Sequence, residues 1–215
     1  MKIAREGVPF IVIGLGILAA ILAVSLTAGG WWWLVVVLWA PIAVWVPFFF
    51  RDPDRPGDRG PDVAVAPADG RVVSIDEIDE PSFVHGRVRR VAIFMNVFNV
   101  HVNRYPTDGT VAHREYRKGR FLNATLDKAS DLNERMTLGI DSPRGPIVIH
   151  QIAGLIARRI VTDHHPGTPV HQGERLGIIR FGSRVELLLP PDVTLLVSVG
   201  DQVRSGQTVI GKWTS

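Results

Sequence analysis

Residues 7–50 carry no charged side chain, which makes this stretch suited to burial in lipid. A membrane-spanning helix needs roughly 20 apolar residues, and the stretch provides about two such lengths separated by a pair of glycines. The pattern predicts a helical hairpin with helices over residues 9–27 and 31–50. Pro41 and Pro47 lie in the second segment, so a hairpin that dips into one leaflet is an alternative to one that spans the bilayer.

The charges that flank the apolar stretch bear on its retention and orientation. Lys2 and Arg5 before an apolar run also fit a cleaved signal peptide, but cleavage would leave a second apolar segment, rich in tryptophan, at the new terminus. We therefore favour retention. Arg51 and Arg55 follow the stretch, and the positive-inside tendency then puts both ends, and the domain after them, on the cytoplasmic side of the cell membrane.

The formal charge of +3 arises from 24 Lys and Arg against 21 Asp and Glu. This excess is too small to indicate nucleic-acid binding, and no basic run is interleaved with aromatic residues. Beside a membrane anchor it fits a domain that rests on anionic lipid headgroups. The chain has no cysteine, which excludes thiol catalysis, disulfides and cysteine-based zinc sites.

Residues 51–62, RDPDRPGDRGPD, have the proline, glycine and charge content of a linker. They separate the anchoring hairpin, residues 1–50, from a domain over residues 63–215. Short apolar runs closed by turn residues fill most of that domain, which predicts a mainly β fold, a compact β-barrel or sandwich. Only residues 120–135 look irregular, with a short helical turn at most.

The C-terminal segment VSVGDQVRSGQTVIG, residues 197–211, resembles the turn and strand unit of lipoyl and biotinyl carrier domains. Residues 170–179 and 203–212 also share a rhythm of valine, two polar residues, glycine and a later apolar run. Those carriers present a modified lysine on a hairpin between two such halves, but residues 181–192 contain no lysine. The sequence therefore predicts carrier-like C-terminal elements without the carrier function.

The stretch GIIRFGSRVELLLP, residues 177–190, looks like a strand interrupted by Gly182 and Ser183. A glycine inside a strand pattern indicates a β-bulge, or a place where another group approaches the backbone closely. A bulge accounts for the backbone but gives Ser183 no role. We therefore treat Ser183 as a candidate for chemistry.

Two other residues could activate a serine hydroxyl. Asp69 lies in PADGRV, where a turn role is the alternative, and His101 lies in the strand-like FNVHVNR, where a half-buried structural role is the alternative. A carboxylate that orients an imidazole, and an imidazole that takes the hydroxyl proton, together activate a weak nucleophile. Sequence separation neither supports nor opposes contact between these side chains.

The other histidines do not indicate a metal site. His164, His165 and His171 lie around a Pro-Gly turn, which favours a solvated loop. The sequence has no glycine-rich phosphate loop, and the order Gly-Ser-Arg at Ser183 lacks the G-x-S-x-G elbow of α/β-hydrolases.

An ordered series of motifs is similar to that of the short-form phosphatidylserine decarboxylase proenzymes. In chain order the motifs read FFFRDPDR, APADGRV, FMNVFNVHVNR, GRFLNATLDKASDLNERM, HQIAGLIARRIV and GERLGIIRFGSRVELLLP. They cover nearly all of the domain after the linker. A lone Gly-Ser pair would be a weak signal, whereas this series is specific.

The resemblance implies that the chain cuts itself between Gly182 and Ser183. Asp69 would orient His101, and His101 would act as the base toward the Ser183 hydroxyl. Ser183 would then become a covalent pyruvoyl group, the only cofactor implied, with no metal. The products would be a β chain, residues 1–182, and an α chain, residues 183–215. The two chains would associate as a heterodimer, and whether heterodimers assemble further stays open.

The implied reaction is the decarboxylation of the membrane lipid phosphatidylserine to phosphatidylethanolamine, through a Schiff base with the pyruvoyl group. Similar enzymes act on serine headgroups of archaeal ether lipids, so the lipid backbone stays open. Long-form members carry a second histidine where this sequence has Phe98, and its role does not carry over. Asn99, Asn103 or a residue from another strand are the candidates to replace it.

Two rival functions remain. A membrane-anchored adaptor built on a lipoyl-like barrel would stay one intact chain without a carbonyl group. A serine hydrolase that uses Asp69, His101 and Ser183 as a triad would also stay intact and would react with fluorophosphonates.

Overall fold

The computed structural model describes residues 2–122, 132–154, 159–180 and 182–213. The chain forms two compact units, Met1–Asp54 and Arg55–Ser215. The division falls inside the predicted linker at residues 51–62.

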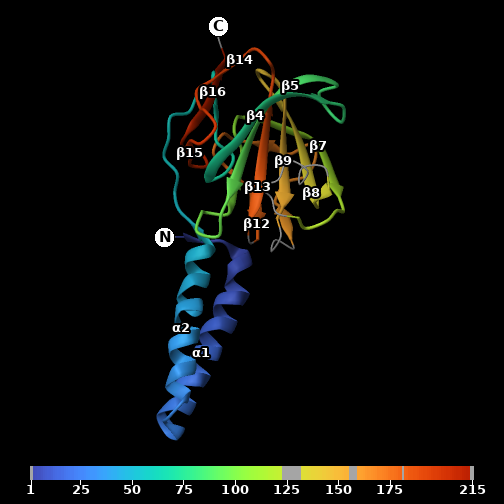
Figure 1. The fold of residues 1–215 in the computed structure, drawn as a ribbon. Helices are drawn as coiled ribbons and strands as arrows, with labels where there is room; N and C mark the ends of the chain where they lie inside the picture. Colours follow the sequence, from blue (N-terminus) through green and yellow to red (C-terminus); the bar gives the residue numbers. More distant parts are fainter. Residues whose placement is uncertain (1, 123–131, 155–158, 181, 214–215) are drawn as a thin grey trace. The chain divides into compact units, whose positions relative to one another are not determined.

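The first unit is a pair of helices, α1 (Val8–Ala28) and α2 (Trp32–Phe49), preceded by a short 3-10 helix, η1 (Arg5–Gly7) (Figure 1). Two-residue strands β1 (Lys2–Ile3) and β2 (Arg51–Asp52) pair antiparallel and bring the two ends of the hairpin together. At 1.5 Å per residue the helices are about 31 and 27 Å long, close to the thickness of a bilayer core. The predicted helical hairpin is confirmed, and α2 continues through both of its prolines.

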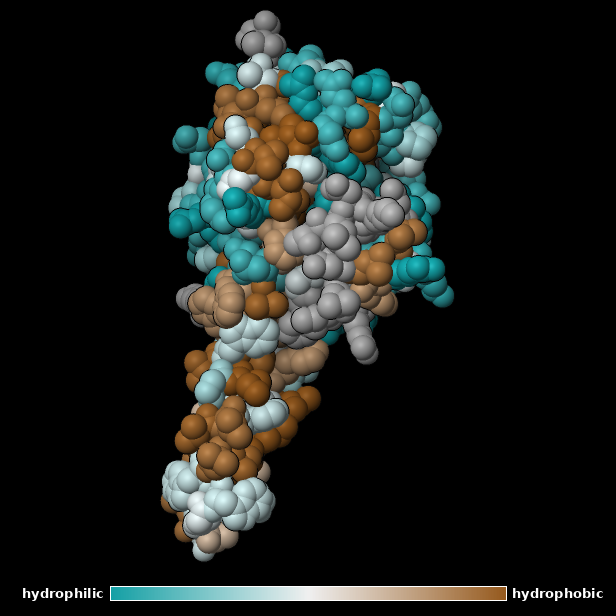
Figure 2. Space-filling model, in the orientation of Figure 1, coloured by the Kyte–Doolittle hydropathy of each residue, from teal (hydrophilic) through white to brown (hydrophobic). Residues whose placement is uncertain are grey.

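The helices present apolar side chains to their surroundings, as Figure 2 shows by their brown surface. Leu26 and Val44 are 75% and 70% exposed, and both helices are long and apolar enough to cross a membrane. Two of their polar groups are bonded within the hairpin: Trp39 Nε1 donates to the Gly14 carbonyl at 3.0 Å, and Ser25 Oγ donates to the Ile21 carbonyl at 2.8 Å. Internal bonding of this kind is what a lipid environment requires.

The second unit consists mainly of strands, as predicted (Figure 1). The strands are β3 (Val63–Val65), β4 (Gly70–Glu80), β5 (Gly86–Met95), β6 (Val102–Arg104), β7 (Gly109–Arg117), β8 (Arg135–Ser142), β9 (Gly145–Ala153), β10 (Ile160–Thr162), β11 (Pro169–Val170), β12 (Arg175–Ile179), β13 (Ser183–Leu189), β14 (Val193–Leu195), β15 (Gln202–Val203) and β16 (Val209–Trp213). Most of the predicted irregular segment at 120–135 lies outside the described residues.

The strands form one large curled sheet and two small ones. The large sheet has eight strands in the order β11-β7-β8-β9-β13-β5-β4-β15, and the small sheets have the orders β10-β12-β6 and β14-β16-β3. This half-barrel, preceded by the helical hairpin, confirms the predicted fold class. β13 lies in the interior of the large sheet, between β9 and β5.

Alternation along β13 divides its side chains between two apolar clusters. Val185, Leu187 and Leu189 belong to the main core, while Leu188 joins Val88 in a smaller cluster. Successive side chains of a strand point to opposite faces, so Ser183 lies on the main-core face and Arg184 and Glu186 on the other.

Candidate active site

Gly182 and Ser183 lie where the chain passes from one sheet to another. β12 ends at Ile179 in a three-stranded sheet, and β13 begins at Ser183 in the eight-stranded sheet. From Ser183 onward, β13 pairs with β5 and β9 without a shift in register. The alternative of a β-bulge within a single strand therefore does not apply, because Gly182 lies in a connection between two sheets.

A second connection joins the same two sheets beside the first. β5 ends at Met95, which pairs with Ser183 in the large sheet, and β6 begins at Val102, which pairs with Ile178 in the small sheet. The two connections are thus neighbours at both ends and run in opposite directions. His101 is the last residue of the second connection, and its carbonyl accepts a hydrogen bond from the Ile179 amide at 3.4 Å.

Gly182 has a backbone conformation that suits glycine. Its φ is +66°, in the left-handed region where other residues are strained. Among the residues that the structure describes, apart from the chain neighbours, none has an atom within 4 Å of the position that a Cβ atom would take. The backbone conformation, and not a lack of space, is what requires glycine here.

The Ser183 side chain is fully buried on the main-core face. Its Oγ donates to the Sδ atom of Met95 at 3.4 Å. A thioether is a weak acceptor, so this bond holds the hydroxyl only loosely.

His101 is also fully buried, at the end of the turn that follows β5. Its Nε2 lies 3.1 Å from the carbonyl oxygen of Asn96. A carbonyl oxygen only accepts, so Nε2 is the protonated nitrogen and Nδ1 carries the lone pair of the neutral ring. Nδ1 is therefore the nitrogen of His101 that could take a proton.

Asp69 directly precedes β4, and it is 8% exposed. Its Oδ2 accepts a hydrogen bond from Arg55 Nη2 at 2.6 Å, and its Oδ1 accepts one from the Ser205 amide at 2.8 Å. The next residue must be glycine, because a Cβ at Gly70 would lie 2.1 Å from the Phe94 carbonyl oxygen. The Asp69 carboxylate is thus held by two donors at the start of β4.

The three predicted site residues come from connected parts of the sheet. Among the described residues, the Ser183 hydroxyl bonds to Met95, and the Asp69 carboxylate bonds to Arg55 and Ser205. Their roles stay predictions.

Sequence reasoning gave no role to Gln151, whose buried amide lies beside Ser183 in a chain of polar groups. Asn103 Nδ2 donates to Met95 Sδ at 3.7 Å, and Gln151 Nε2 donates to Asn103 Oδ1 at 2.7 Å. Thr162 Oγ1 in turn donates to Gln151 Oε1 at 3.1 Å. Asn103 and Gln151 are both fully buried, unlike Phe98, which is 65% exposed. The signal available in the sequence was that Asn103 and Gln151 are polar residues within the apolar patterns of their strands.

The described residues contain no cluster of three or more histidine and acidic residues that could hold a metal ion. His165 and His171 are exposed, as the predicted solvated loop requires. His164 is only partly exposed, and its Nδ1 lies 3.1 Å from the buried Tyr105 hydroxyl. Burial, followed by the charges of Glu174 and Asp163, raises the pKa of Tyr105, so the phenol stays protonated at neutral pH.

Residues 42–211 match the family model described as phosphatidylserine decarboxylase. The chain belongs to the phosphatidylserine decarboxylase family. It is 48% identical over 212 residues to a phosphatidylserine decarboxylase proenzyme of Magnetococcus marinus, with 98% of this chain and 94% of the relative covered. It is 46% identical over 211 residues to the protein of that name from Symbiobacterium thermophilum, with 98% and 95% covered.

A third relative with the same name, from Desulfotalea psychrophila, is 41% identical over 213 residues, with 99% of this chain and 97% of the relative covered. The recognition from sequence motifs is confirmed, and the chain is a member of a decarboxylase enzyme family. The range matched by the phosphatidylserine decarboxylase model includes α2 from residue 42 and both connections between the sheets.

Proposed function

We propose that the chain decarboxylates phosphatidylserine to phosphatidylethanolamine, with a pyruvoyl group made from its own Ser183. The observation that carries the proposal is the adjacency of two sheet connections, one ending at His101 and the other containing Gly182. Family membership supports the substrate and the reaction.

The first step is self-cleavage. The Ser183 hydroxyl loses its proton and attacks the Gly182 carbonyl carbon, and the acyl group moves from nitrogen to oxygen to give an ester. Loss of the Ser183 Cα proton then breaks the Cβ–O bond, which releases the Gly182 carboxylate and leaves dehydroalanine at position 183. Addition of water and loss of ammonia convert dehydroalanine to the pyruvoyl group.

His101 is the base that we assign to this step. It reaches the cleavage region because its connection runs beside the one that contains Gly182. With Nε2 bonded to Asn96, proton transfer from the Ser183 hydroxyl uses Nδ1. Asp69 supplies a fixed negative charge that favours the imidazolium formed.

The surroundings of position 183 fit a pyruvoyl group. The group would keep the three-carbon skeleton of serine, with a methyl in place of the hydroxymethyl side chain, and the nearby Met95, Asn103 and Gln151 offer an apolar contact and amide groups. The keto carbonyl would condense with the amine of the substrate and accept the electrons that remain when carbon dioxide leaves. The buried amides restrict the orientation of groups at this position.

The cut chains would stay associated. β13 becomes the N-terminal strand of the α chain, residues 183–215, and it pairs along its length with β5 and β9 of the β chain. These backbone hydrogen bonds, and the core side chains of β13, hold the two chains together as a heterodimer.

The apolar hairpin would keep the enzyme at the membrane that contains its substrate. Both helices have the length and composition of membrane spans. Lys2 and Arg51 lie on paired strands at the open end of the hairpin, and these positive charges support a cytoplasmic location for that end. Lipid extraction from the bilayer then need not be complete.

Release of carbon dioxide from carboxyl-labelled phosphatidylserine in mixed micelles tests the proposal. The purified protein should release label, and Ser183→Ala should release none. The ether-linked serine lipid, assayed in parallel, determines the lipid backbone. Label release by Ser183→Ala equal to that of the unmodified protein would overturn the proposal, and reaction of the intact chain with a fluorophosphonate would favour a serine hydrolase.

A further inference from the structure

The domain contains two copies of one arrangement of strands. In the large sheet, β11-β7-β8-β9-β13-β5-β4-β15, strands at equal distances from the two ends correspond: β11 to β15, β7 to β4, β8 to β5 and β9 to β13. The small sheets β10-β12-β6 and β14-β16-β3 correspond in the same way. The shared rhythm of residues 170–179 and 203–212 belongs to this duplication, since the first stretch joins β11 to β12 and the second joins β15 to β16.

The turns before β4 and β7 show the correspondence in sequence and in hydrogen bonds. They read PADGRV from residue 67 and PTDGTV from residue 106. In the first turn, Asp69 Oδ1 accepts a hydrogen bond from the Ser205 amide at 2.8 Å. In the second turn, Asp108 Oδ1 accepts one from the Gln172 amide at 2.9 Å. The two copies therefore share one backbone plan.

Three polar side chains of one copy surround a glycine in its small sheet. Asn103 of β6 and Thr162 of β10 pair with Gly177 of β12 from its two sides. Gln151 of β9 connects them, because its Oε1 accepts from Thr162 at 3.1 Å and its Nε2 donates to Asn103 at 2.7 Å. Asn103 Nδ2 then donates to Met95 Sδ at 3.7 Å. The donors of this amide series thus run in one sense, from Thr162 toward Met95.

The other copy has apolar side chains at the same three positions. Ala64 of β3 and Leu195 of β14 pair with Gly211 of β16. Leu189 of β13 lies against this glycine, with its Cδ1 3.5 Å from the place of a Cβ atom. Ala64 and Leu189 belong to the main core, and Leu195 packs against it. The fold does not require polar groups at these positions, since its own second copy is built with apolar ones.

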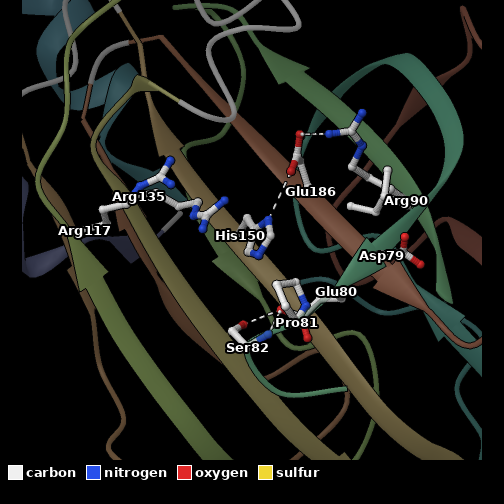
Figure 3. A pocket seen from close by; sticks show the side chains of 10 residues that line it. Asp79, Glu80, Pro81, Ser82, Arg90, Arg117, Arg135, His150 and Glu186 are labelled. Atoms are coloured by element: carbon white, nitrogen blue, oxygen red, sulfur yellow. Dashed lines mark hydrogen bonds and ion pairs between the residues drawn. The ribbon is translucent and has the colours of Figure 1, made fainter. Parts of the chain in front are cut away.

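On the opposite face of the large sheet, polar groups are accounted for by one another. Figure 3 shows Glu186 between His150 and Arg90, at 3.1 and 3.5 Å, in a pocket of about 240 Å³. Three arginines and three carboxylates line this pocket. Two of the arginines, Arg117 and Arg135, are direct partners on β7 and β8. The charges of the lining thus offset one another.

The amide series calls for a different explanation, because it lies within the main core. Gln151 pairs with Val185 of that core, and amides buried among apolar groups destabilise a fold unless hydrogen bonds offset the loss of water. The series ends at Met95 Sδ, a weak acceptor to which Ser183 Oγ also donates. Hydrogen bonds that run in one sense polarise one another, which strengthens the final donor, Asn103 Nδ2. A strengthened donor thus has a weak acceptor beside the residue that is proposed to react.

We propose that Asn103 donates a hydrogen bond to a carbonyl or carboxylate oxygen of the reaction at Ser183. Gln151 and Thr162 position its amide. The proposal rests on the function proposed above, which supplies two such oxygens. One is the carbonyl oxygen of Gly182, which gains negative charge during self-cleavage, and the other belongs to the carboxylate of the serine headgroup. Either is a better acceptor than a thioether.

The double variant Asn103→Leu with Gln151→Leu tests the proposal in the full-length protein in detergent, because it replaces both amides with apolar side chains, as in the other copy. We expect it to unfold in one cooperative transition and to slow self-cleavage or decarboxylation by about tenfold or more, as when one donor to an oxyanion is removed. Gln172→Leu is the matched control. Gln172 is also a buried amide, bonded to the Val63 and Pro106 carbonyls at 2.7 and 3.0 Å, and its loss should leave both rates unchanged.

Two assays distinguish the two oxygens. Time courses on denaturing gels give the rate of self-cleavage, and carbon dioxide release by the cut chains gives kcat/KM for phosphatidylserine. Slower self-cleavage in the double variant identifies the Gly182 carbonyl as the acceptor. Unchanged self-cleavage with a lower kcat/KM identifies the carboxylate of the lipid headgroup.

Asn103→Asp keeps the proposal testable if the double variant does not fold. Assayed at alkaline pH, where the new carboxyl is ionised, it keeps an acceptor for Gln151 but removes the donor, and it should slow one of the two steps. Rates equal to those of the unmodified protein in both steps, or an equal loss in Gln172→Leu, would overturn the proposal. An unmodified protein that stays uncut would overturn the proposed function, and this proposal with it.

Discussion

The Ser183 hydroxyl and the Asn103 amide both donate to the Sδ atom of Met95, at 3.4 and 3.7 Å. The sulfur atom thus connects the proposed pyruvoyl precursor to a buried chain of amides that continues to Gln151. A buried amide left without its partner lowers the stability of the protein by more than the hydrogen bond itself contributes. This series of bonded amides is therefore sensitive to substitution of one of its members.

Asn103→Ala should lower the free energy of unfolding by about 1–3 kcal/mol, because Gln151 Nε2 loses its buried acceptor. Chemical denaturation measures the change. The double variant Asn103→Leu with Gln151→Leu removes both amides and should recover part of the loss. A double variant that is less stable than the sum of the single Leu variants would contradict this interpretation.

Gly182→Ala should slow self-cleavage, because the φ of +66° costs an L residue about 1–2 kcal/mol and the peptide carbonyl shifts when the backbone relaxes. Gly145→Ala is the matched control. Gly145 also has a positive φ, +104°, and no neighbour closer than 3.8 Å, but it begins β9 at the opposite end from Ala153, which pairs with Ser183. Time courses on denaturing gels should show slower cleavage in the Gly182 variant alone, and equal rates in both would refute this role of Gly182.

His101→Ala should slow self-cleavage by about 10²- to 10⁴-fold, the usual contribution of a general base. Time courses on denaturing gels measure the rate.

Asp69→Asn should also slow self-cleavage, although the Asp69 carboxylate bonds to Arg55 in the intact chain. Arg55→Gln separates the two explanations for Asp69. If Arg55→Gln slows cleavage as much as Asp69→Asn, the carboxylate acts through its ion pair and not on His101.

The β4–β5 turn makes stability depend on pH through Glu80. Burial alone would raise the pKa of this carboxyl, but hydrogen bonds from the Ser82 hydroxyl and from the amides of Val84, Phe83 and Ser82 lower the pKa from 4.5 to about 2. The contribution of the ionised group is therefore present above about pH 4.5 and is lost as the pH falls through about 2.

Glu80→Gln should accordingly be less stable than the unmodified protein by about 1–2 kcal/mol at pH 7, and the difference should shrink below pH 4.5. Denaturant unfolding across this pH range measures it. Asp79→Asn is the control, because that side chain is 77% exposed. A difference for Glu80→Gln that is the same at pH 3 and pH 7 would be inconsistent with the lowered pKa.

The helical hairpin and the mainly β domain could be predicted because both depend on local patterns, an uncharged apolar stretch and short runs closed by turns. The crossing between sheets at Gly182 could not, since the sequence there reads as a single strand with an interruption at Gly182 and Ser183. The pairing of Met95 with Ser183, and the contact between Asn103 and Gln151, join residues far apart in the chain. Local patterns carry no information on such contacts.

The position of Arg117 opposite Arg135 had no signal in the sequence for the same reason. Arg117 and Arg135 become neighbours only when β7 pairs with β8. Asp69 and His101 were candidates from their residue types, and the family resemblance supplied their roles. The structure adds that the Asp69 carboxylate is held by Arg55 and Ser205.

The intact mass of the purified protein under denaturing conditions tests the central claim most directly. We predict two chains, residues 1–182 and 183–215, with the smaller lighter by one ammonia than a serine-terminated chain of that sequence. Ser183→Ala should give a single chain of 215 residues. A single uncut chain in the unmodified protein, or two chains in Ser183→Ala, would contradict the account.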